Sequence, residues 1–289
     1  MNHLTNIMFK TPNFEALKQA GFTLTDMHFH SLYSDTFTRI NHILNKASEL
    51  GINVALTDHN SIEGVRRAYN NRHKVNIIPG IEISCVEGHH ILVYFPTLDA
   101  LEDFYIKHVE GRQNKDPYSS TSIKTEELLD ACESYDCLIV AAHPFSFGYY
   151  GIMKNIMRGF ISKDVLERIH AIEVICGSNL RRHNRDALEL VEQTGKPFTG
   201  GSDGHSIGEM GSVVVCTKSN TTRGILEEIK QRKNLVIGRE NKLRYKLLSG
   251  SKLTCCHLPY LESNLRFRYN NLYKKSLKYY KERLKQKLP

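Results

Sequence analysis

The stretch TDMHFHS, residues 25–31, places His28 and His30 two positions apart at the end of a short apolar run. In a β-strand, side chains at positions i and i+2 point to the same face, so both imidazoles can reach one ion. Similar endings recur in ALTDHNS (55–61), LIVAAHPFS (138–146) and TGGSDGHS (199–206). In a parallel α/β barrel the carboxyl ends of the strands converge on one face, where active sites lie.

Helical patterns separate these runs. Apolar residues at helical spacing from Ile40 to Leu50, followed by Gly51, predict a helix. Similar patterns predict helices over 61–73, 121–135, 184–192 and 222–232. Short apolar strands that alternate with helices indicate an α/β fold with a parallel sheet or barrel. We expect the polar residues 96–120 and the Gly-, Tyr- and Phe-rich residues 144–164 to be insertions or lids between strands.

The composition excludes several classes of protein. The chain has 289 residues, of which 40% are hydrophobic and 24% charged, so disorder along its whole length is excluded. No apolar run is long enough for a transmembrane helix, and the N-terminus lacks the apolar core of a secretory signal. Seven cysteines without a CxxC pair suggest neither a disulfide framework nor a zinc ribbon. We therefore expect a cytoplasmic protein without a membrane partner.

The positive charge is concentrated at the C-terminus. Residues 240–289 hold 13 Lys or Arg against 3 Asp or Glu, whereas residues 1–239 are nearly neutral. This boundary suggests a catalytic domain over 1–239 and a basic helical extension over 240–289. The two interpretations of the extension are a contact with a nucleic acid and a solvated helix face. An apolar stripe in this extension (Tyr273, Leu277, Tyr280, Leu284 and Leu288) favours, by a small margin, a helix that braces the barrel.

Histidine and carboxylate residues gather at the predicted strand ends. A single HxH pair is weak evidence, but the joint recurrence is not expected of unrelated structural histidines. Mixed imidazole and carboxylate donors suit Mn²⁺, Zn²⁺ or Fe²⁺. Their number exceeds the needs of one ion and predicts two or three divalent ions per chain. The nine candidate ligands are His28, His30, Asp35, His59, Glu82, His90, His143, Asp203 and His205.

The chain resembles the PHP (polymerase and histidinol phosphatase) family of metal-dependent phosphoesterases. The resemblance rests on MHFHSLYSD, ALTDHNSIEG, PGIEIS, HILVYF, AAHPFS and GSDGH, which follow one another in the family's order between about residues 23 and 215. It implies a distorted (β/α)₇ TIM-like barrel with a trinuclear metal site at its C-terminal face. Asp35 stands where some members have histidine, and this form resembles the trinuclear nucleotide-phosphatase and exoribonuclease branch.

The same resemblance implies which residues share an ion. The first ion would take His28, His30, Glu82 and Asp203. Glu82 would bridge to a second ion completed by His90 and His143, and a third would take Asp35, His59 and His205. The resemblance favours His90 over His89, because the family's pattern places its histidine directly before ILxYF. Adjacent strand residues point to opposite faces, so only one of the two should face inward.

Three further residues are candidates for supporting roles. Asp58 is expected to hydrogen-bond a metal-bound imidazole, or else to lie at a helix N-terminus. Arg181 and Arg182 follow a predicted strand at the same rim, and their guanidinium groups suit bidentate phosphate binding.

These observations predict a hydrolase that cleaves a phosphate ester through a metal-activated hydroxide, with a nucleotide or oligonucleotide as the favoured substrate. The first alternative is a small-metabolite phosphatase such as histidinol-phosphate phosphatase. An amidohydrolase with an HxH barrel explains Asp35, Glu82 and the DGH motif less well. A non-catalytic PHP binding module is disfavoured because none of the nine ligand positions is lost.

Overall fold

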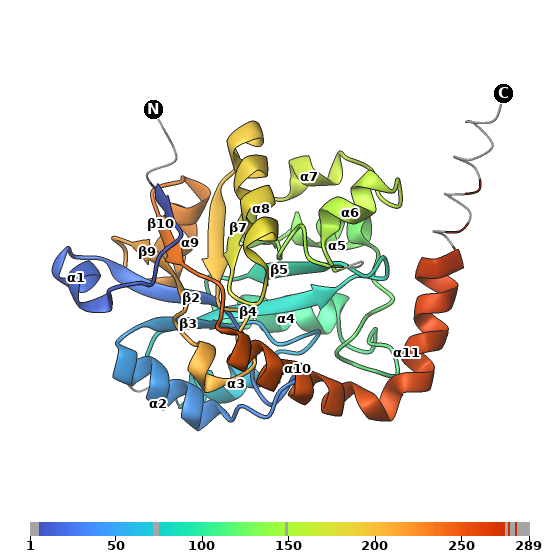
Figure 1. The fold of residues 1–289 in the computed structure, drawn as a ribbon, viewed down its shortest axis with the longest axis horizontal. Coiled ribbons are helices and arrows are strands. Elements are labelled where there is room, and N and C mark those ends of the chain that lie inside the picture. Colours follow the sequence, from blue (N-terminus) through green and yellow to red (C-terminus); the bar gives the residue numbers. More distant parts are fainter. Residues whose placement is uncertain (1–5, 72–74, 148–149, 275–276, 278–280, 282–289) are drawn as a thin grey trace.

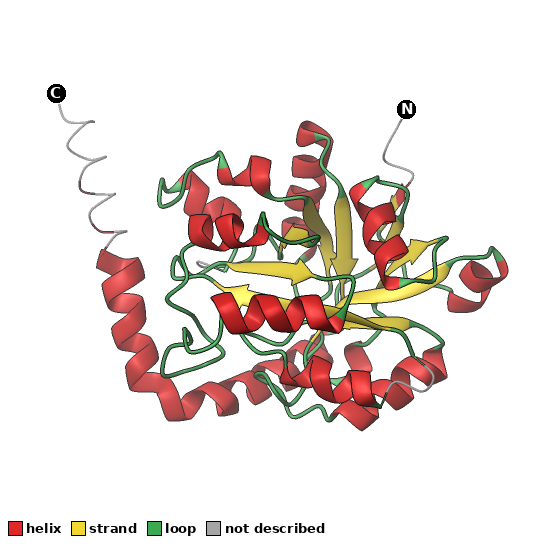
Figure 2. Cartoon of the chain, turned by 180° about the vertical axis from the view of Figure 1, so that it is seen from behind, coloured by secondary structure: helices red, strands yellow, loops and turns green. Residues whose placement is uncertain are grey.

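A computed structural model describes residues 6–71, 75–147, 150–274, 277 and 281. Its strands form one curled sheet in the order β1-β10-β9-β2-β3-β4-β5-β6-β7-β8. The helices lie around the strands, as Figures 1 and 2 show from opposite sides. No helix in the described ranges is long and apolar enough to span a bilayer. The strands are β1 (Ile7–Met8), β2 (Thr23–Phe29), β3 (Asn53–Leu56), β4 (Ile77–Ser84), β5 (His90–Tyr94), β6 (Leu138–Ala141), β7 (Ala171–Cys176), β8 (Phe198–Gly201), β9 (Val213–Thr217) and β10 (Leu235–Gly238).

The sheet is mixed, whereas the sequence pattern predicted a parallel one. Neighbours β2, β3 and β4 are parallel, as are β6, β7 and β8, but β5 runs antiparallel to both β4 and β6. The reversal at β5 follows from its connection: only residues 85–89 join it to β4, with Gly88 at φ 96°. Such a link is too short for a parallel crossover and forms a hairpin instead.

The two ends of the β2–β8 series meet and curl the sheet into a barrel-like shape. Phe29 and Gly204 form a parallel bridge, and the His30 amide donates to the Gly204 carbonyl at 3.0 Å. Glycine allows this approach, because a Cβ on Gly201 would lie 2.3 Å from the Cβ of His28. The strands are almost wholly buried, and in β4 every residue is. This α/β fold confirms the predicted fold class.

The helices largely follow the sequence pattern. The predicted helices at 40–50, 61–73, 121–135, 184–192 and 222–232 correspond to α2, α3, α5, α8 and α9. The interpretation of residues 96–120 as an irregular insertion was wrong for the first half of this segment. That half forms helix α4, with Thr97 as its N-cap. The helices are α1 (Phe14–Gln19), α2 (Ile40–Leu50), α3 (Glu63–Asn70), α4 (Leu98–His108), α5 (Thr125–Cys132), α6 (Ile152–Met157), α7 (Val165–Arg168), α8 (Arg181–Thr194), α9 (Thr222–Lys230), α10 (Leu243–His257) and α11 (Leu261–Arg268).

The chain leaves the sheet after β10 as two consecutive helices, α10 and α11, which we call the C-terminal arm. In Figure 1 the arm runs along the lower edge of the molecule and then turns upward along one side. Of the apolar stripe predicted to brace the barrel, Tyr273 and Leu277 are 51% and 56% exposed, so at these two positions the expected packing was wrong. Tyr280, Leu284 and Leu288 lie outside the described residues.

Candidate metal centre

The predicted ligands come from strand ends that the fold brings together. His28 lies on β2 and His30 just after it, Glu82 on β4, and His90 at the start of β5. His59, His143 and Asp203 follow β3, β6 and β8. All nine predicted ligands are buried although every one is polar or charged. Buried charges of this kind are rare unless they are paired or bind an ion.

The Glu82 carboxylate lies at the middle of this cluster. Its Oε1 is 3.0 Å from His90 Nδ1 and 3.1 Å from His143 Nε2. Its Oε2 is 3.2 Å from His28 Nε2, 3.3 Å from His30 Nε2 and 3.3 Å from His59 Nδ1. Each oxygen therefore faces a different set of imidazoles, as a carboxylate that bridges two ions would.

The donor atoms form three overlapping groups, and within each group all the atoms lie within 4.8 Å of one another. The groups share His30, His59 and Glu82 and therefore form one continuous cluster. Asp203 joins it through Oδ1, 3.2 Å from His30 Nε2, and Asp35 through Oδ1, 3.2 Å from His205 Nε2. The groups are His28, His30, Glu82 and Asp203; His30, Asp35, His59 and His205; and His59, Glu82 and His90.

The electrostatics of the cluster couple its acids and bases. Burial opposes ionisation of Glu82, but the imidazoles of His59, His28 and His90 outweigh it and hold the pKa of Glu82 well below its ordinary value. Burial likewise opposes the charged form of His30, yet contacts with Asp203 and Glu82 raise its pKa to about 10. Burial lowers the pKa of His59 to about 3. The carboxylates are thus ionised, as metal ligands must be.

Two of these residues have an unusual backbone. His143 has φ 28° and Asp203 has φ 47°, both in the left-handed region that side chains other than glycine rarely adopt. The His143 amide donates to Glu173 Oε2 at 2.7 Å, which holds that turn. Backbone strain of this kind clusters at functional sites.

The structure places His90, not His89, beside Glu82, as the resemblance implied. His90 points to Glu82, whereas His89 Nε2 lies 3.0 Å from Thr125 Oγ1 and its Nδ1 lies 3.0 Å from Asn155 Nδ2. His89 forms a further group with Cys85 and Glu87 on that opposite side. Both nitrogen atoms of His89 thus have partners that lie outside the Glu82 cluster.

Glu173 was missed by the sequence reasoning. It lies on β7, and its Oε1 is 2.9 Å from His28 Nδ1, so it fixes the ring whose Nε2 faces Glu82. Carboxylates that orient a ligand histidine in this way tune metal sites. The signal was present in HAIEVIC, since a single acidic residue inside a buried apolar strand requires a partner.

Asp58 supports the site differently from the prediction. It accepts hydrogen bonds from the Ser31 amide and the Ser31 hydroxyl, both at 2.6 Å, instead of from a ligand imidazole. The expected bond to an imidazole was therefore wrong. Asp58 fixes the turn between His30 and Asp35 through the backbone, and burial raises its pKa to about 6.

The two arginines differ in availability. Arg181 donates to Glu240 at 2.9 Å, and its guanidinium lies 4.6 Å from the centre of the Phe9 ring. Arg182 is exposed at the first turn of α8. Of the two, Arg182 is the more exposed, and its Nε donates to His183 Nε2 at 3.2 Å.

The C-terminal arm brings two residues to the same region that the sequence reasoning did not single out. Lys246 donates to the Asn179 carbonyl at 2.6 Å. His257 Nδ1 is 2.6 Å from Asp116 Oδ2, and His257 Nε2 is 3.9 Å from Asp35 Oδ2. Both lie on one face of α10, because their separation of eleven residues corresponds to about three helical turns.

The donor set fits divalent metal ions. In the described part of the chain, four buried nitrogen atoms in the cluster, His30 Nδ1, His90 Nε2, His143 Nδ1 and His205 Nε2, lack a hydrogen-bond partner. Such atoms are costly to bury unless they have a partner. Imidazole and carboxylate donors without a thiolate favour Mn²⁺, Zn²⁺ or Fe²⁺ over a purely oxygen-ligated ion.

Comparison with known proteins agrees with this picture. Residues 181–234 match the PHP-associated family model, and no curated protein matches the chain by sequence. Endonuclease Q, in complex with a 27-mer duplex carrying an abasic lesion, is similar in structure with a TM-score of 0.59 and 18% identity. The similarity covers 76% of this chain but only 60% of that endonuclease.

Two further solved structures have the same fold. The lesion-specific endonuclease PfuEndoQ from Pyrococcus furiosus has a TM-score of 0.58 and 20% identity, over 74% of this chain and 57% of its own. A two-domain protein from Bacteroides vulgatus with a predicted PHP-like metal-dependent phosphoesterase has a TM-score of 0.54 and 16% identity, over 80% and 68%. The resemblance to the PHP family, and with it the PHP fold, is therefore confirmed.

Proposed function

We propose that this chain, which has the PHP fold, is a metal-dependent phosphoesterase. The observation that carries the proposal is the position of Glu82, whose two oxygen atoms face five imidazoles from four different segments. A buried cluster of this composition binds cations, and clustered divalent ions are suited to phosphoryl oxygens. Two endonucleases and a protein with a predicted PHP-like metal-dependent phosphoesterase share this fold, which supports the proposal.

The proposed arrangement has three ions. His28, His30, Glu82 and Asp203 would hold the first, Glu82 with His90 and His143 the second, and Asp35, His59 and His205 the third. The overlapping donor groups support the first and third sets, whereas the group around the second consists of Glu82, His90 and His59. His143 Nε2 lies 3.1 Å from Glu82 Oε1, which supports its place in the second set. When bound, Mn²⁺, Zn²⁺ or Fe²⁺ would supply an activated water and neutralise the charge on the phosphoryl oxygens.

The chain's own residues would organise this chemistry. Glu173 fixes the His28 ring, and Asp58 fixes the Ser31 turn. Glu209 accepts hydrogen bonds from the amides of His205 and Ser206 at 2.9 and 2.8 Å and so fixes the DGH loop. These contacts pre-organise the ligands, which limits the reorganisation required during reaction.

We propose a nucleotide or oligonucleotide as the substrate. The concentration of positive charge after residue 240 supports a polyanionic partner. A neighbour bound to a DNA duplex shows that this fold can accept a nucleic acid. Arg182, exposed at the rim, is a candidate contact for a substrate phosphate.

The test is hydrolysis by the Mn²⁺-loaded protein of a panel of nucleotides, oligonucleotides, phosphorylated metabolites and an aryl phosphate. His30→Ala serves as the blank because His30 belongs to two of the donor groups. We expect turnover by the wild type that is lost in His30→Ala and on chelation. Equal activity in wild type and His30→Ala would contradict the proposal.

A further inference from the structure

A cavity of about 320 Å³ lies between the metal centre and the C-terminal arm. Asp35, His59 and His90 line one side, and Leu253, Leu258 and Leu261 of the arm line another. Its volume is at the lower end of the roughly 300–1,000 Å³ found for small-molecule sites. The cavity therefore joins a cation-binding surface to an apolar surface at a size that suits a compact ligand.

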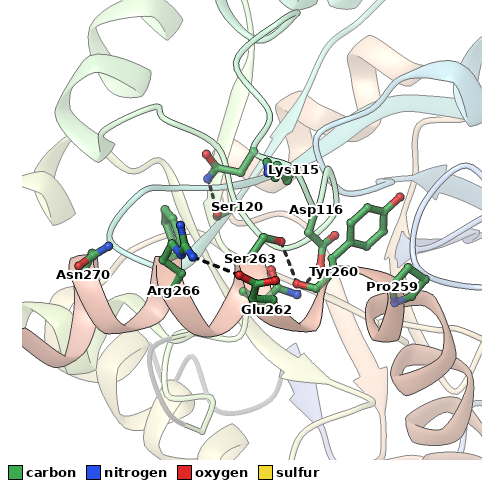
Figure 3. A pocket seen from close by; sticks show the side chains of 12 residues that line it. Lys115, Asp116, Ser120, Pro259, Tyr260, Glu262, Ser263, Arg266 and Asn270 are labelled. Carbon is green, nitrogen blue, oxygen red and sulfur yellow. Dashed lines mark hydrogen bonds and ion pairs between the residues drawn. The ribbon is translucent and has the colours of Figure 1, made fainter.

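The arm is held in place by the loop that precedes α5. Asp116 is the anchor: its Oδ2 lies 2.6 Å from both His257 Nδ1 and Asn264 Nδ2, and it is buried. Ser119 adds a hydrogen bond to Asn264 at 2.9 Å. Figure 3 shows Asp116 and Ser120 of this loop facing Tyr260 and Ser263 of the arm across a neighbouring pocket.

This anchoring orients His257. Because Nδ1 is engaged by Asp116, the opposite nitrogen, Nε2, faces the cavity 3.9 Å from Asp35 Oδ2. A hydrogen bond to one ring nitrogen of a histidine determines which way the other nitrogen points. His257 thus presents a polar atom beside the proposed ions, although it belongs to none of the three donor groups.

The leucines beside His257 remain incompletely covered. Leu258 and Leu261 are 62% and 54% exposed, although they line a cavity that is continuous with the metal centre. Exposed apolar surface in such a position is typical of a ligand-binding wall. Its continuity with cation-binding residues indicates a ligand with an anionic group and an apolar or planar group.

We propose that the C-terminal arm completes the substrate site. Asp116 positions His257 to contact the phosphoryl group of the ester, and Leu253, Leu258 and Leu261 receive the alcohol part. The substrate class is a phosphate ester of a compact planar or apolar alcohol, of which a single nucleoside unit is an example. This inference rests on the proposed phosphoesterase function and names the part of the chain that selects its substrate.

The experiment measures binding of two non-hydrolysable probes, phenylphosphonate and methylphosphonate, to the Mn²⁺-loaded full chain by calorimetry. We expect the wild type to prefer phenylphosphonate by about tenfold, the effect of burying a small apolar group. Leu261→Asp should abolish this preference. Leu247→Asp is the matched control, because Leu247 is 67% exposed on the same arm and does not line this cavity, and it should keep the preference.

His257 is tested with the same probes. His257→Ala should weaken both phosphonates by a similar factor and leave the bound metal unchanged. Asp116→Ala should weaken binding of both phosphonates by a similar factor. The double variant His257→Ala/Asp116→Ala should bind little more weakly than either single variant. Asp116→Asn should keep much of the wild-type affinity, because it retains an acceptor for His257. Loss of metal in His257→Ala would instead make His257 a metal ligand and overturn its proposed contact with the substrate.

The outcomes separate this inference from the proposed function. Equal affinity of the wild type for the two phosphonates would overturn the selecting role of the arm, even if phosphate esters are hydrolysed. Selective phosphonate binding without turnover of any ester would contradict the phosphoesterase proposal and leave the arm as the selecting element of a binding site.

Discussion

At the residue scale, Glu82 and Asp35 occupy unequal positions in the cluster. Glu82 belongs to two of the three overlapping donor groups, whereas Asp35 belongs to one, together with His30, His59 and His205. We expect Glu82→Gln to lose metal from two sites and Asp35→Asn from one. Elemental analysis of the purified variants measures the difference, and equal losses would contradict the bridging role of Glu82.

The residue-scale predictions from sequence succeeded where strand geometry determines the outcome. His28 and His30 point to the same region because they are two positions apart along extended backbone, and only one of His89 and His90 can face Glu82 because adjacent residues alternate. The supporting contacts were less predictable. Asp58 bonds to Ser31 rather than to a histidine, and its choice of partner depends on how the turn after β2 lies against β3.

At the element scale, the approach of β8 to β2 fixes the spacing of the ligands. A Cβ added to Gly201 would lie 2.3 Å from the His28 Cβ and 2.5 Å from its backbone nitrogen, so Gly201→Ala must push β8 away from β2. We expect destabilisation by about 1–3 kcal/mol, typical of overpacking, together with loss of bound metal. Thermal unfolding and metal analysis measure both effects.

Gly250 offers a matched control for that substitution. It lies within α10, and an added Cβ would meet no atom within 4 Å. Gly250→Ala should stabilise the protein by up to about 1 kcal/mol through helix propensity and leave the metal unchanged. A similar loss of metal in both variants would show that the effect of Gly201→Ala is not local to the β8–β2 contact.

The elements themselves were predictable where one periodicity dominates. Helix α2 begins and ends at the residues that its apolar spacing and Gly51 indicate. The antiparallel β5 was not foreseen, because its direction depends on the five-residue link and not on the apolar pattern of the strand. Helix α4 was missed because its region reads as polar, with Leu101 and Phe104 as its buried residues.

At the scale of the whole molecule, metal binding and pH should act together on stability. The pKa of His30 is raised from 6.5 to about 10 in the metal-free chain. Its charged form therefore stabilises the fold below about pH 6.5, and this contribution is lost as the pH rises through about 10. Metal binding requires the neutral imidazole, so stabilisation by the ion increases with pH.

We expect the gain in melting temperature on addition of Mn²⁺ to increase between about pH 6.5 and 8.5, in contrast to the metal-free protein, which should become less stable. Paired thermal scans with Mn²⁺ or with a chelator measure this gain at each pH. In His30→Ala the gain in melting temperature should depend less on pH. A gain that stays constant or shrinks as the pH rises would argue against displacement of protons by metal at this cluster.

The position of the C-terminal arm could not be predicted from the sequence. The charge boundary near residue 240 is visible in the sequence, but the contact of His257 with Asp116 joins residues 141 positions apart. No local pattern encodes such a contact, since it depends on where β10 ends and on the loop before α5. Sequence reasoning thus identified the residues of the buried histidine and carboxylate cluster but did not assign a role to the residues of the arm beside it.

The end of the chain allows a final test, in which the protein is truncated after Tyr269. This keeps α10 and α11 and removes seven Lys or Arg (Lys274, Lys275, Lys278, Lys281, Arg283, Lys285 and Lys287) against one acid, Glu282. The exposure of Tyr273 and Leu277 argues against a brace at these positions. We therefore expect an unchanged melting temperature, weaker binding of oligonucleotides and intact hydrolysis of a mononucleotide or aryl phosphate.

The salt dependence of oligonucleotide affinity distinguishes a tail that binds a polyanion from a tail that braces the barrel. Each phosphate of a single strand that the tail neutralises contributes about −0.7 to the slope of log affinity against log salt concentration. If the tail binds a polyanion, truncation should make the slope for an oligonucleotide less negative by about 0.7 for each phosphate contact that is lost. The slope for a mononucleotide should change little. A lower melting temperature with the same oligonucleotide affinity and the same slope would instead show that the last residues brace the barrel. The two roles differ because a brace contributes through apolar burial, which does not depend on phosphate, whereas a polyanion contact acts through charge that salt screens.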